Sequence, residues 1–185
     1  SDHLHASNMR IVDIRGHVLP ANAPTPHYYN PRADYDVSHI PGAVFIDWVK
    51  EITDPADPRH AQIAKPDRYA EVMSRNGIDK DTLVIAYDDA GGMFAARLWW
   101  SLNYYGHNNV AILDGGWTKW VAENRPTTSD IPTISPKSFV AQPNPVLHRN
   151  AEQVIKSLGT TTKLMDMRSE EEFRGDYARA VRAGH

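Results

Sequence analysis

Short apolar runs alternate with amphipathic segments along the first two thirds of the chain. Four of these runs have the length and the aliphatic content of buried strands, and they lie at residues 9–16, 43–46, 83–87 and 110–113. Three segments carry apolar residues at helical spacing, and they lie at residues 65–78, 93–100 and 117–123. Strands that alternate with helices in this order predict an α/β domain with a mainly parallel sheet.

Two of the predicted strands run into a glycine turn and then into a helix. Residues 88–92 follow the strand at 83–87, and residues 114–116 follow the strand at 110–113. This order is a common way to hold an anion, because backbone N–H groups converge at the helix N-terminus. No lysine with serine or threonine follows in the spacing of a P-loop, so the pattern does not favour a phosphate.

The pattern changes between residues 126 and 149. Helical periodicity is weak there, and prolines recur at Pro126, Pro132, Pro136, Pro143 and Pro145. Such a composition predicts an extended interdomain linker over 126–149. Beyond it, residues 151–158 read as an amphipathic helix and Lys163–Arg168 as a further strand.

A short internal repeat links the two ends of the chain. Arg10–Arg15 (RIVDIR) and Lys163–Arg168 (KLMDMR) share two apolar residues, an aspartate, a third apolar residue and an arginine. His39 follows the first aspartate by 26 residues, and His185 follows the second by 19. The repeat therefore predicts that a second unit of the same kind begins near residue 150.

Composition narrows the possible chemistry. The 185 residues are enough for one α/β domain and part of another, and 41% of them are apolar. A net charge of −3 with interspersed signs argues against nucleic acid, and no run approaches the roughly 18 apolar residues of a membrane helix. We expect a cytoplasmic protein, because the polar start does not resemble a secretory leader.

Cysteine is absent from the sequence, and the nine histidines show no ligand spacing. No disulfide, thiolate metal site or cysteine nucleophile is therefore available within this chain, and we expect neither a metal nor another cofactor.

Three segments together resemble the two-domain sulfurtransferases of the rhodanese superfamily, which act on thiosulfate or 3-mercaptopyruvate. They are SHIPGAVFID at 38–47, the strand, turn and helix with the LDGGW segment at 84–120, and LMDMRSEEEFRGDYARAVRAGH at 164–185. The resemblance implies a three-layer α/β fold with a mainly parallel sheet of about five strands, followed by a truncated second copy. It also implies a catalytically silent first domain at 1–125, a Pro-rich linker at 126–149, and the first helix and strand of the second domain at 150–185.

The resemblance also implies where sulfur would be carried. In this family the second domain holds a cysteine on the loop after the strand, and that cysteine passes sulfur as a persulfide to a thiophilic acceptor such as cyanide. Asp88 stands at the equivalent position of the first domain. A carboxylate cannot carry a persulfide, so we expect Asp88 to accept the N–H groups of its own loop and the first domain to be inert.

No catalytic residue is then expected within this chain, and the cysteine should lie downstream of residue 185. The partners implied are a small sulfur donor, a small acceptor and the remaining C-terminal part of the same protein, separated by truncation or by cleavage. Met93 and Phe94 are expected to form an apolar wall of the neighbouring active site, and Arg168 to contact substrate.

One position in the sequence indicates which sulfur donor is favoured. Mercaptopyruvate-type relatives carry an arginine four residues after the arginine of D-x-R, whereas this chain has Glu172 there. The carboxylate of Glu172 would repel the carboxylate of mercaptopyruvate, so thiosulfate is favoured as donor, with 3-mercaptopyruvate as the alternative.

Two other functions also stay open for this chain, namely a non-catalytic binding or regulatory module and a phosphatase on the same fold. His39 is expected to make a structural hydrogen bond rather than to act as a base.

Overall fold

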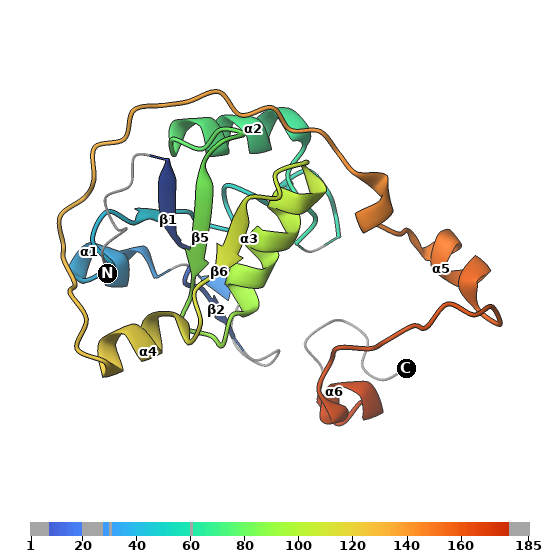
Figure 1. Cartoon of the computed structure of the whole chain (residues 1–185). Helices are drawn as coiled ribbons and strands as arrows, with labels where there is room; N and C mark the ends of the chain where they lie inside the picture. Colours follow the sequence, from blue (N-terminus) through green and yellow to red (C-terminus); the bar gives the residue numbers. More distant parts are fainter. Residues whose placement is uncertain (1–7, 20–27, 30, 60, 178–185) are drawn as a thin grey trace.

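A four-stranded parallel sheet forms the centre of the computed structural model, which describes residues 8–19, 28–29, 31–59 and 61–177 (Figure 1). Its strands are β1 (Met9–Asp13), β4 (Val44–Phe45), β5 (Leu83–Tyr87) and β6 (Val110–Ile112), and the order across the sheet is β4-β1-β5-β6. The four strands predicted for the first two thirds of the chain are confirmed. The described part of the chain thus has four strands in this sheet, where about five were expected.

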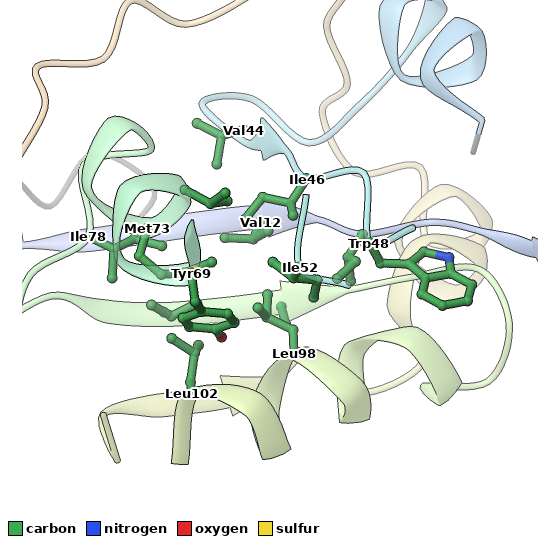
Figure 2. Close-up of a cluster of buried hydrophobic side chains, with 14 of the residues drawn as sticks. Val12, Val44, Ile46, Trp48, Ile52, Tyr69, Met73, Ile78, Leu98 and Leu102 are labelled. Atoms are coloured by element: carbon green, nitrogen blue, oxygen red, sulfur yellow. The ribbon is translucent and has the colours of Figure 1, made fainter. Parts of the chain in front are cut away.

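Helices cover both faces of the sheet, which confirms the three layers. Val12 of β1 and Ile14 directly after it lie in the larger core, whereas Ile11 lies in the smaller one, because successive side chains of an extended chain alternate between faces. The larger core is closed by α2 (Pro66–Arg75) and α3 (Met93–Tyr104), as Figure 2 shows. The smaller core is closed by Trp120 of α4 (Gly116–Ala122).

The sequence predicts α2 well for identifiable reasons. Pro66 occupies the first turn, where its missing N–H costs nothing, and Asp67 complements the positive end of the helix dipole. The buried side chains of the helix, Tyr69, Val72 and Met73, recur at three and four residues.

Two small features between β1 and β4 were not predicted. The strands β2 (His17–Val18) and β3 (Tyr28–Tyr29) pair in antiparallel fashion, and α1 (Arg32–Val37) lies in what reads as a loop. Neither strand is long enough to show periodicity, and the N-terminus of α1 has no side-chain cap.

The segment at 126–149 is extended as predicted, apart from the short helix η1 (Pro145–Leu147). Its contacts with the first domain were not predicted. Thr128 exchanges two backbone hydrogen bonds with His39, Phe139 is buried in the larger core, and Asn144 donates its backbone N–H to the Tyr104 carbonyl over 2.7 Å. The segment therefore follows the surface of the domain, passing outside α2 (Figure 1).

The last described part contains α5 (Ala151–Ser157), which confirms the predicted helix, and α6 (Glu170–Arg174). The strand predicted for Lys163–Arg168 is wrong for the chain as described, because the segment pairs with no other strand. A strand needs a neighbour for its backbone groups, and β1 has two, β4 and β5. The helices α5 and α6 stand apart from the sheet in Figure 1. The division of the chain into one complete and one truncated unit stays a prediction.

Candidate functional site

The turn after β5 is filled by the side chain of its own first residue. Asp88 is 2% exposed, and its Oδ1 accepts the N–H groups of Ala90 at 2.9 Å and Gly92 at 2.8 Å. Its Oδ2 accepts the N–H groups of Phe94 at 2.7 Å and Ala95 at 2.8 Å. Four otherwise unpaired donors at the start of α3 are thereby satisfied by one carboxylate, which confirms the hydrogen bonding expected of Asp88.

The second glycine turn packs directly against this one. The backbone N–H of Trp117 donates to the Asp88 carbonyl over 2.8 Å. A Cβ on Gly116 would lie 2.2 Å from the same carbonyl oxygen, and the φ of Gly116 is +54°. Only glycine fits this close approach, and the two turns therefore meet at the carboxyl edge of the sheet.

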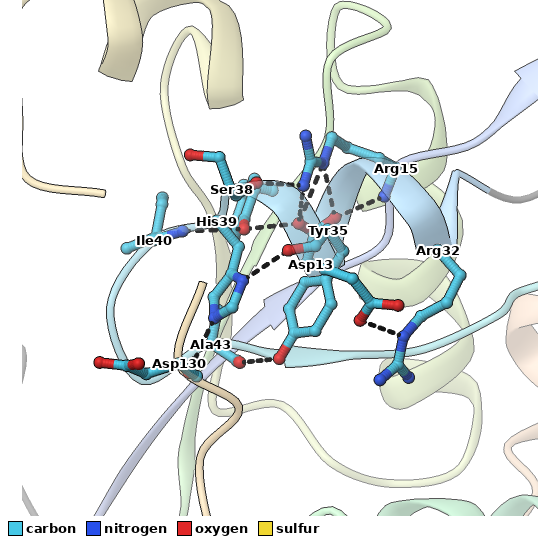
Figure 3. A network of polar contacts seen from close by, with 11 residues as sticks. Asp13, Arg15, Arg32, Tyr35, Ser38, His39, Ile40, Ala43 and Asp130 are labelled. Carbon is cyan, nitrogen blue, oxygen red and sulfur yellow. Dashed lines mark hydrogen bonds and ion pairs between the residues drawn. The ribbon is translucent and has the colours of Figure 1, made fainter. Parts of the chain in front are cut away.

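A buried ion pair lies at the end of β1 on the same edge (Figure 3). Arg15 Nη2 is 2.8 Å from Asp13 Oδ2, with the two side chains 3% and 0% exposed. The Tyr87 hydroxyl donates to Asp13 over 2.6 Å, and Arg15 Nη2 donates to the Ser38 carbonyl over 2.9 Å. Burial is the largest single influence and lowers the pKa of the Arg15 guanidinium, but the hydrogen bond to Asp13 and the surrounding negative charges together outweigh burial, so the pKa is raised. The guanidinium also lies 4.6 Å from the Trp117 ring centre.

Tyr87 is held in its protonated form. Burial is the largest cause that raises the pKa of its hydroxyl, and the neighbouring Asp13 raises it further. The group therefore serves as a hydrogen-bond donor and ties β5 to β1.

His39 has the structural role that the sequence indicated. It is fully buried, stacks on Tyr35 with ring centres 3.9 Å apart, and its Nδ1 lies 2.7 Å from the Tyr35 carbonyl. Its Nε2 lies 3.2 Å from the Asp130 carbonyl of the extended segment. Both ring nitrogens thus face protein acceptors rather than a substrate position (Figure 3).

Asp89 lies on the same edge of the sheet, directly after Asp88. Its Oδ1 is buried and accepts no hydrogen bond. Burial is the largest cause that raises the pKa of this carboxyl, against the opposing charges of His17 and Arg15. The sequence does not indicate that this second aspartate has a raised pKa or a buried oxygen without a hydrogen bond. Its surroundings come from β2 and β1, which are distant in sequence.

The expected wall residues separate in the structure. Met93 is 46% exposed, whereas Phe94 is 3% exposed and packs beside Trp48 with ring centres 5.4 Å apart. Adjacent residues of a helix point about 100° apart, so one faces outward and the other faces the core. Within this chain, Met93 alone of the two offers an exposed surface.

Arg168 lies on the segment between α5 and α6, where it pairs with Asp166 over 2.7 Å. The hydrogen bond from Arg168 is the largest cause that lowers the pKa of Asp166, to about 2. Glu172 caps α6, because its carboxylate accepts the Ser169 N–H over 3.1 Å and the Ser169 hydroxyl accepts the Glu172 N–H over 3.3 Å. The structure does not bring Arg168 together with Asp88.

Cavities of about 440 and 570 Å³ lie beside His107 and Phe139 and beside Trp48 and Arg68. A smaller cavity of about 230 Å³ is lined by Leu113, Gly116 and Trp120, next to the second glycine turn. Among the described residues, no three histidine, aspartate or glutamate side chains gather as they would around a metal ion. Within the same part of the chain, none of the helices has the length and apolar character needed to span a bilayer.

The fold agrees with comparisons to known proteins. The model of the rhodanese-like domain matches residues 1–123, and the chain belongs to this family. Mycobacterium tuberculosis SseA, whose name describes a thiosulfate sulfurtransferase, is 40% identical over 166 residues, which cover 82% of this chain and 53% of that protein. The Thermus thermophilus sulfur carrier protein TtuD is 36% identical over 201 aligned positions, which cover the whole of this chain and 63% of that protein.

A solved structure supports the same assignment. Escherichia coli SseA, described as a 3-mercaptopyruvate sulfotransferase, superimposes with a TM-score of 0.84 at 26% identity, over 100% of this chain and 68% of that one. The chain thus spans about half to two thirds of the length of these relatives. Several relatives are named thiosulfate sulfurtransferases, whereas the Escherichia coli structure is described as that of a 3-mercaptopyruvate sulfotransferase.

Proposed function

We propose that this chain is the catalytically silent first unit, with the beginning of a second, of an enzyme that transfers sulfane sulfur from thiosulfate to a thiophilic acceptor such as cyanide. One observation carries the proposal, namely that the Asp88 carboxylate occupies the anion cradle at the end of β5. A cradle whose four N–H groups are already bonded has no place for a thiolate or a persulfide.

Sulfur transfer would proceed in two steps on a cysteine of the polypeptide beyond residue 185. The cysteine thiolate attacks the sulfane sulfur of thiosulfate, the S–S bond breaks, and sulfite leaves with its electron pair. Cyanide then attacks the outer sulfur of the persulfide, which yields thiocyanate and restores the thiolate. Backbone N–H groups of the corresponding turn would stabilise that thiolate, as those of this turn stabilise Asp88.

Residues 1–125 supply the scaffold in this proposal, residues 126–149 connect the units, and the second unit begins at residue 150. Met93 contributes an exposed apolar side chain to the wall of the neighbouring active site, while Phe94 supports it from the core. The partners are the small donor, the small acceptor and the remaining C-terminal part of the protein. The cytoplasmic location stays a prediction.

Thiosulfate is the favoured donor, and 3-mercaptopyruvate is the alternative. Glu172 stands where mercaptopyruvate-type relatives have an arginine, and its carboxylate is held by the capping box of α6 rather than left free to move away. A fixed negative charge at that place disfavours a carboxylate-bearing donor.

A non-catalytic binding module is a second candidate, because the 185 residues contain no cysteine. A phosphatase on this fold would also need a cysteine. This chain alone therefore supports neither sulfur transfer nor phosphatase activity.

Thiocyanate formation tests the proposal. We expect the 185-residue chain to produce none from thiosulfate and cyanide, and the full-length polypeptide to produce it with a lower KM for thiosulfate than for 3-mercaptopyruvate. Alanine in place of the downstream cysteine should abolish the reaction. A full-length protein that turns over neither donor would favour the binding module, and a preference for 3-mercaptopyruvate would reverse the choice of donor.

A further inference from the structure

His107 is a buried histidine at the amino edge of the sheet, opposite the Asp88 turn. It lies between α3 and β6, is 4% exposed, and has its Nε2 3.2 Å from the Asn109 carbonyl oxygen. Since a carbonyl oxygen only accepts hydrogen bonds, this contact requires a proton on Nε2. A neutral imidazole with that proton satisfies the contact without bringing a charge into the domain.

The ring of His107 lies against the extended segment at 126–149. Its centre is 5.8 Å from the centre of the Phe139 ring, and Phe139 is the side chain through which the segment enters the larger core. Three residues further on, the Gln142 N–H donates to the Tyr105 carbonyl over 3.0 Å. The segment is therefore docked on the domain directly beside this histidine.

The cavity of about 440 Å³ lies at this docking contact. It is lined by residues 79–81, residues 105–107 and four residues of the segment, with His107 and Phe139 both in its wall. Residues 137–142 belong to no helix or strand, so they have no ladder of hydrogen bonds to break when they move. Movement of the segment away from the cavity would open the imidazole ring to water while the sheet stays formed.

The titratable side chains around His107 come from the turn after α2, from the end of α3 and from the segment. They are Asp79, Lys80, Asp81, Tyr105 and Lys137. Asp79 is paired with Lys137 at 3.3 Å, and its pKa is lowered chiefly by the hydrogen bond from the Thr82 hydroxyl, so it stays ionised in mild acid. Asp81 is paired with Lys80 at 2.8 Å, and burial raises the pKa of Tyr105 to about 12. Residues 108–113, on the side of β6, contain no charged residue. Neither carboxylate therefore offers its full charge to an imidazolium at His107.

The protonated form of His107 is accordingly disfavoured while the segment is docked. Burial is the largest cause and lowers the pKa of the imidazole from its ordinary value of 6.5, against the opposing effects of the Asn109 and Thr82 carbonyls and of the Asp79 charge. Above pH 6.5 the ring is neutral whether the segment is docked or open, so docking costs nothing there. As the pH falls below 6.5 the open form takes up the proton first, and the docked form loses stability relative to it.

We propose that His107 is a pH-sensitive latch, which holds the segment on the domain when neutral and releases residues 137–142 when protonated, so that the imidazolium reaches water. Release gives the chain between the domain and α5 a longer reach in mild acid. The latch lies wholly within the described chain and does not depend on sulfur transfer, so the two proposals can fail separately.

Hydrogen exchange of single amides tests the latch on the 185-residue chain. The reporters are the Lys137 and Phe139 N–H groups, which donate to the Ser74 carbonyl and hydroxyl. NMR measures their exchange between pH 5.0 and 8.0, and each rate is corrected for the intrinsic rate at that pH. From pH 7.5 to 5.5 we expect both protection factors to fall at least about threefold and at most about tenfold, which is the full effect of one pH unit below 6.5.

Two variants assign the effect to this histidine. His107→Gln keeps a neutral N–H donor for the Asn109 carbonyl and cannot become charged, so the protection of both reporters should no longer vary with pH. His148→Gln is the matched control, because His148 is an exposed histidine of the same segment, and it should keep the pH dependence of wild type. The Thr128 N–H, which donates to the His39 carbonyl at the other end of the segment, should be equally protected in wild type and in His107→Gln.

The imidazole itself gives a second readout that needs no variant. In wild type, NMR should show that His107 titrates below pH 6.5 and that the Phe139 ring signals follow the same curve. A His107 pKa at or above 6.5 would overturn the latch. Reporters whose protection does not depend on pH, or an equal pH dependence in His107→Gln, would overturn it as well.

Discussion

Two adjacent aspartates occupy opposite electrostatic situations at the end of β5. Asp88 accepts four backbone N–H groups, whereas the buried Oδ1 of Asp89 accepts none. The sequence predicts the first situation, because an aspartate before a glycine turn and a helix is a favoured cap. It does not predict the second, since the surroundings of Asp89 include His17 and Arg15 from a distant part of the chain.

Replacing Asp88 tests how strongly the cradle depends on its carboxylate. We expect Asp88→Asn to lower the free energy of unfolding by about 3 kcal/mol, because two of the four N–H groups would face an amide that cannot accept from them. Chemical denaturation monitored by tryptophan fluorescence measures this change. A loss below about 1 kcal/mol would contradict the account of the turn.

Replacing Asp89 should change the free energy of unfolding in the opposite direction, and it provides the matched control. The folded-state pKa of Asp89 is raised, so its ionisation destabilises the folded chain as the pH rises above the ordinary value of 3.8. At pH 7 we expect Asp89→Asn to stabilise the chain by well under about 1 kcal/mol, because it removes a half-buried carboxylate whose Oδ1 accepts no hydrogen bond and whose charge is partly screened by solvent. The gain should shrink as the pH falls towards 3.8 and vanish below it. A gain independent of pH would show that ionisation is not its cause.

At the scale of elements, the extended segment at 126–149 belongs physically to the first domain. Lys137 donates its backbone N–H to the Ser74 carbonyl over 2.9 Å, and the Phe139 N–H donates to the Ser74 hydroxyl over 3.0 Å. Phe139 is 7% exposed and contacts the core between α2 and α3, whereas its neighbour Val140 is 69% exposed. The segment is therefore anchored through one aromatic side chain, and it leads the chain to the C-terminal end of α3, where the Asn144 N–H donates to the Tyr104 carbonyl.

Phe139→Ala should lower the free energy of unfolding by about 3 kcal/mol, since it empties part of the larger core. Limited proteolysis should then cut the segment at 126–149 much faster than in wild type. Val140→Ala is the control and should change stability by less than about 0.5 kcal/mol. Equal effects of the two substitutions would show that the segment is not anchored by Phe139.

Elements with strong periodicity could be predicted and those defined by tertiary contacts could not. The strand Leu83–Tyr87 and the helix Pro66–Arg75 carry their signals locally, in aliphatic content and in spacing. Lys163–Arg168 has the signal of a strand but no neighbour to pair with in the described chain. The docking of Phe139 has no local signal, because a phenylalanine in a proline-rich segment is compatible with either exposure or burial.

In the candidate site, too, the features encoded locally could be predicted and those defined by tertiary contacts could not. The role of Asp88 follows from residue type and position, and the turn confirms its hydrogen bonding. Grouping Met93 with Phe94 overlooked that adjacent helical residues face different directions, which the exposed fractions of 46% and 3% make plain. The role expected of Arg168 stays a prediction, and in the described chain Arg168 pairs with Asp166.

At the scale of the whole molecule, the chain combines a sheet that is covered on both faces with a sequence repeat of its first strand, and the apolar residues of that repeat are exposed. The sulfur transfer proposed for the protein needs a thiol, and these 185 residues contain none. The two facts are consistent if the first unit supplies structure and one wall, and another part of the polypeptide supplies the nucleophile.

Locating the transferred sulfur tests this central claim most directly. The full-length polypeptide is incubated with thiosulfate, digested without reductant, and its peptides are searched by mass spectrometry for one added sulfur atom. We predict that the added sulfur is found on one cysteine-containing peptide beyond residue 185 and on no peptide from residues 1–185. Sulfane sulfur covalently bound within residues 1–185, at the Asp88 turn or elsewhere, would contradict the account.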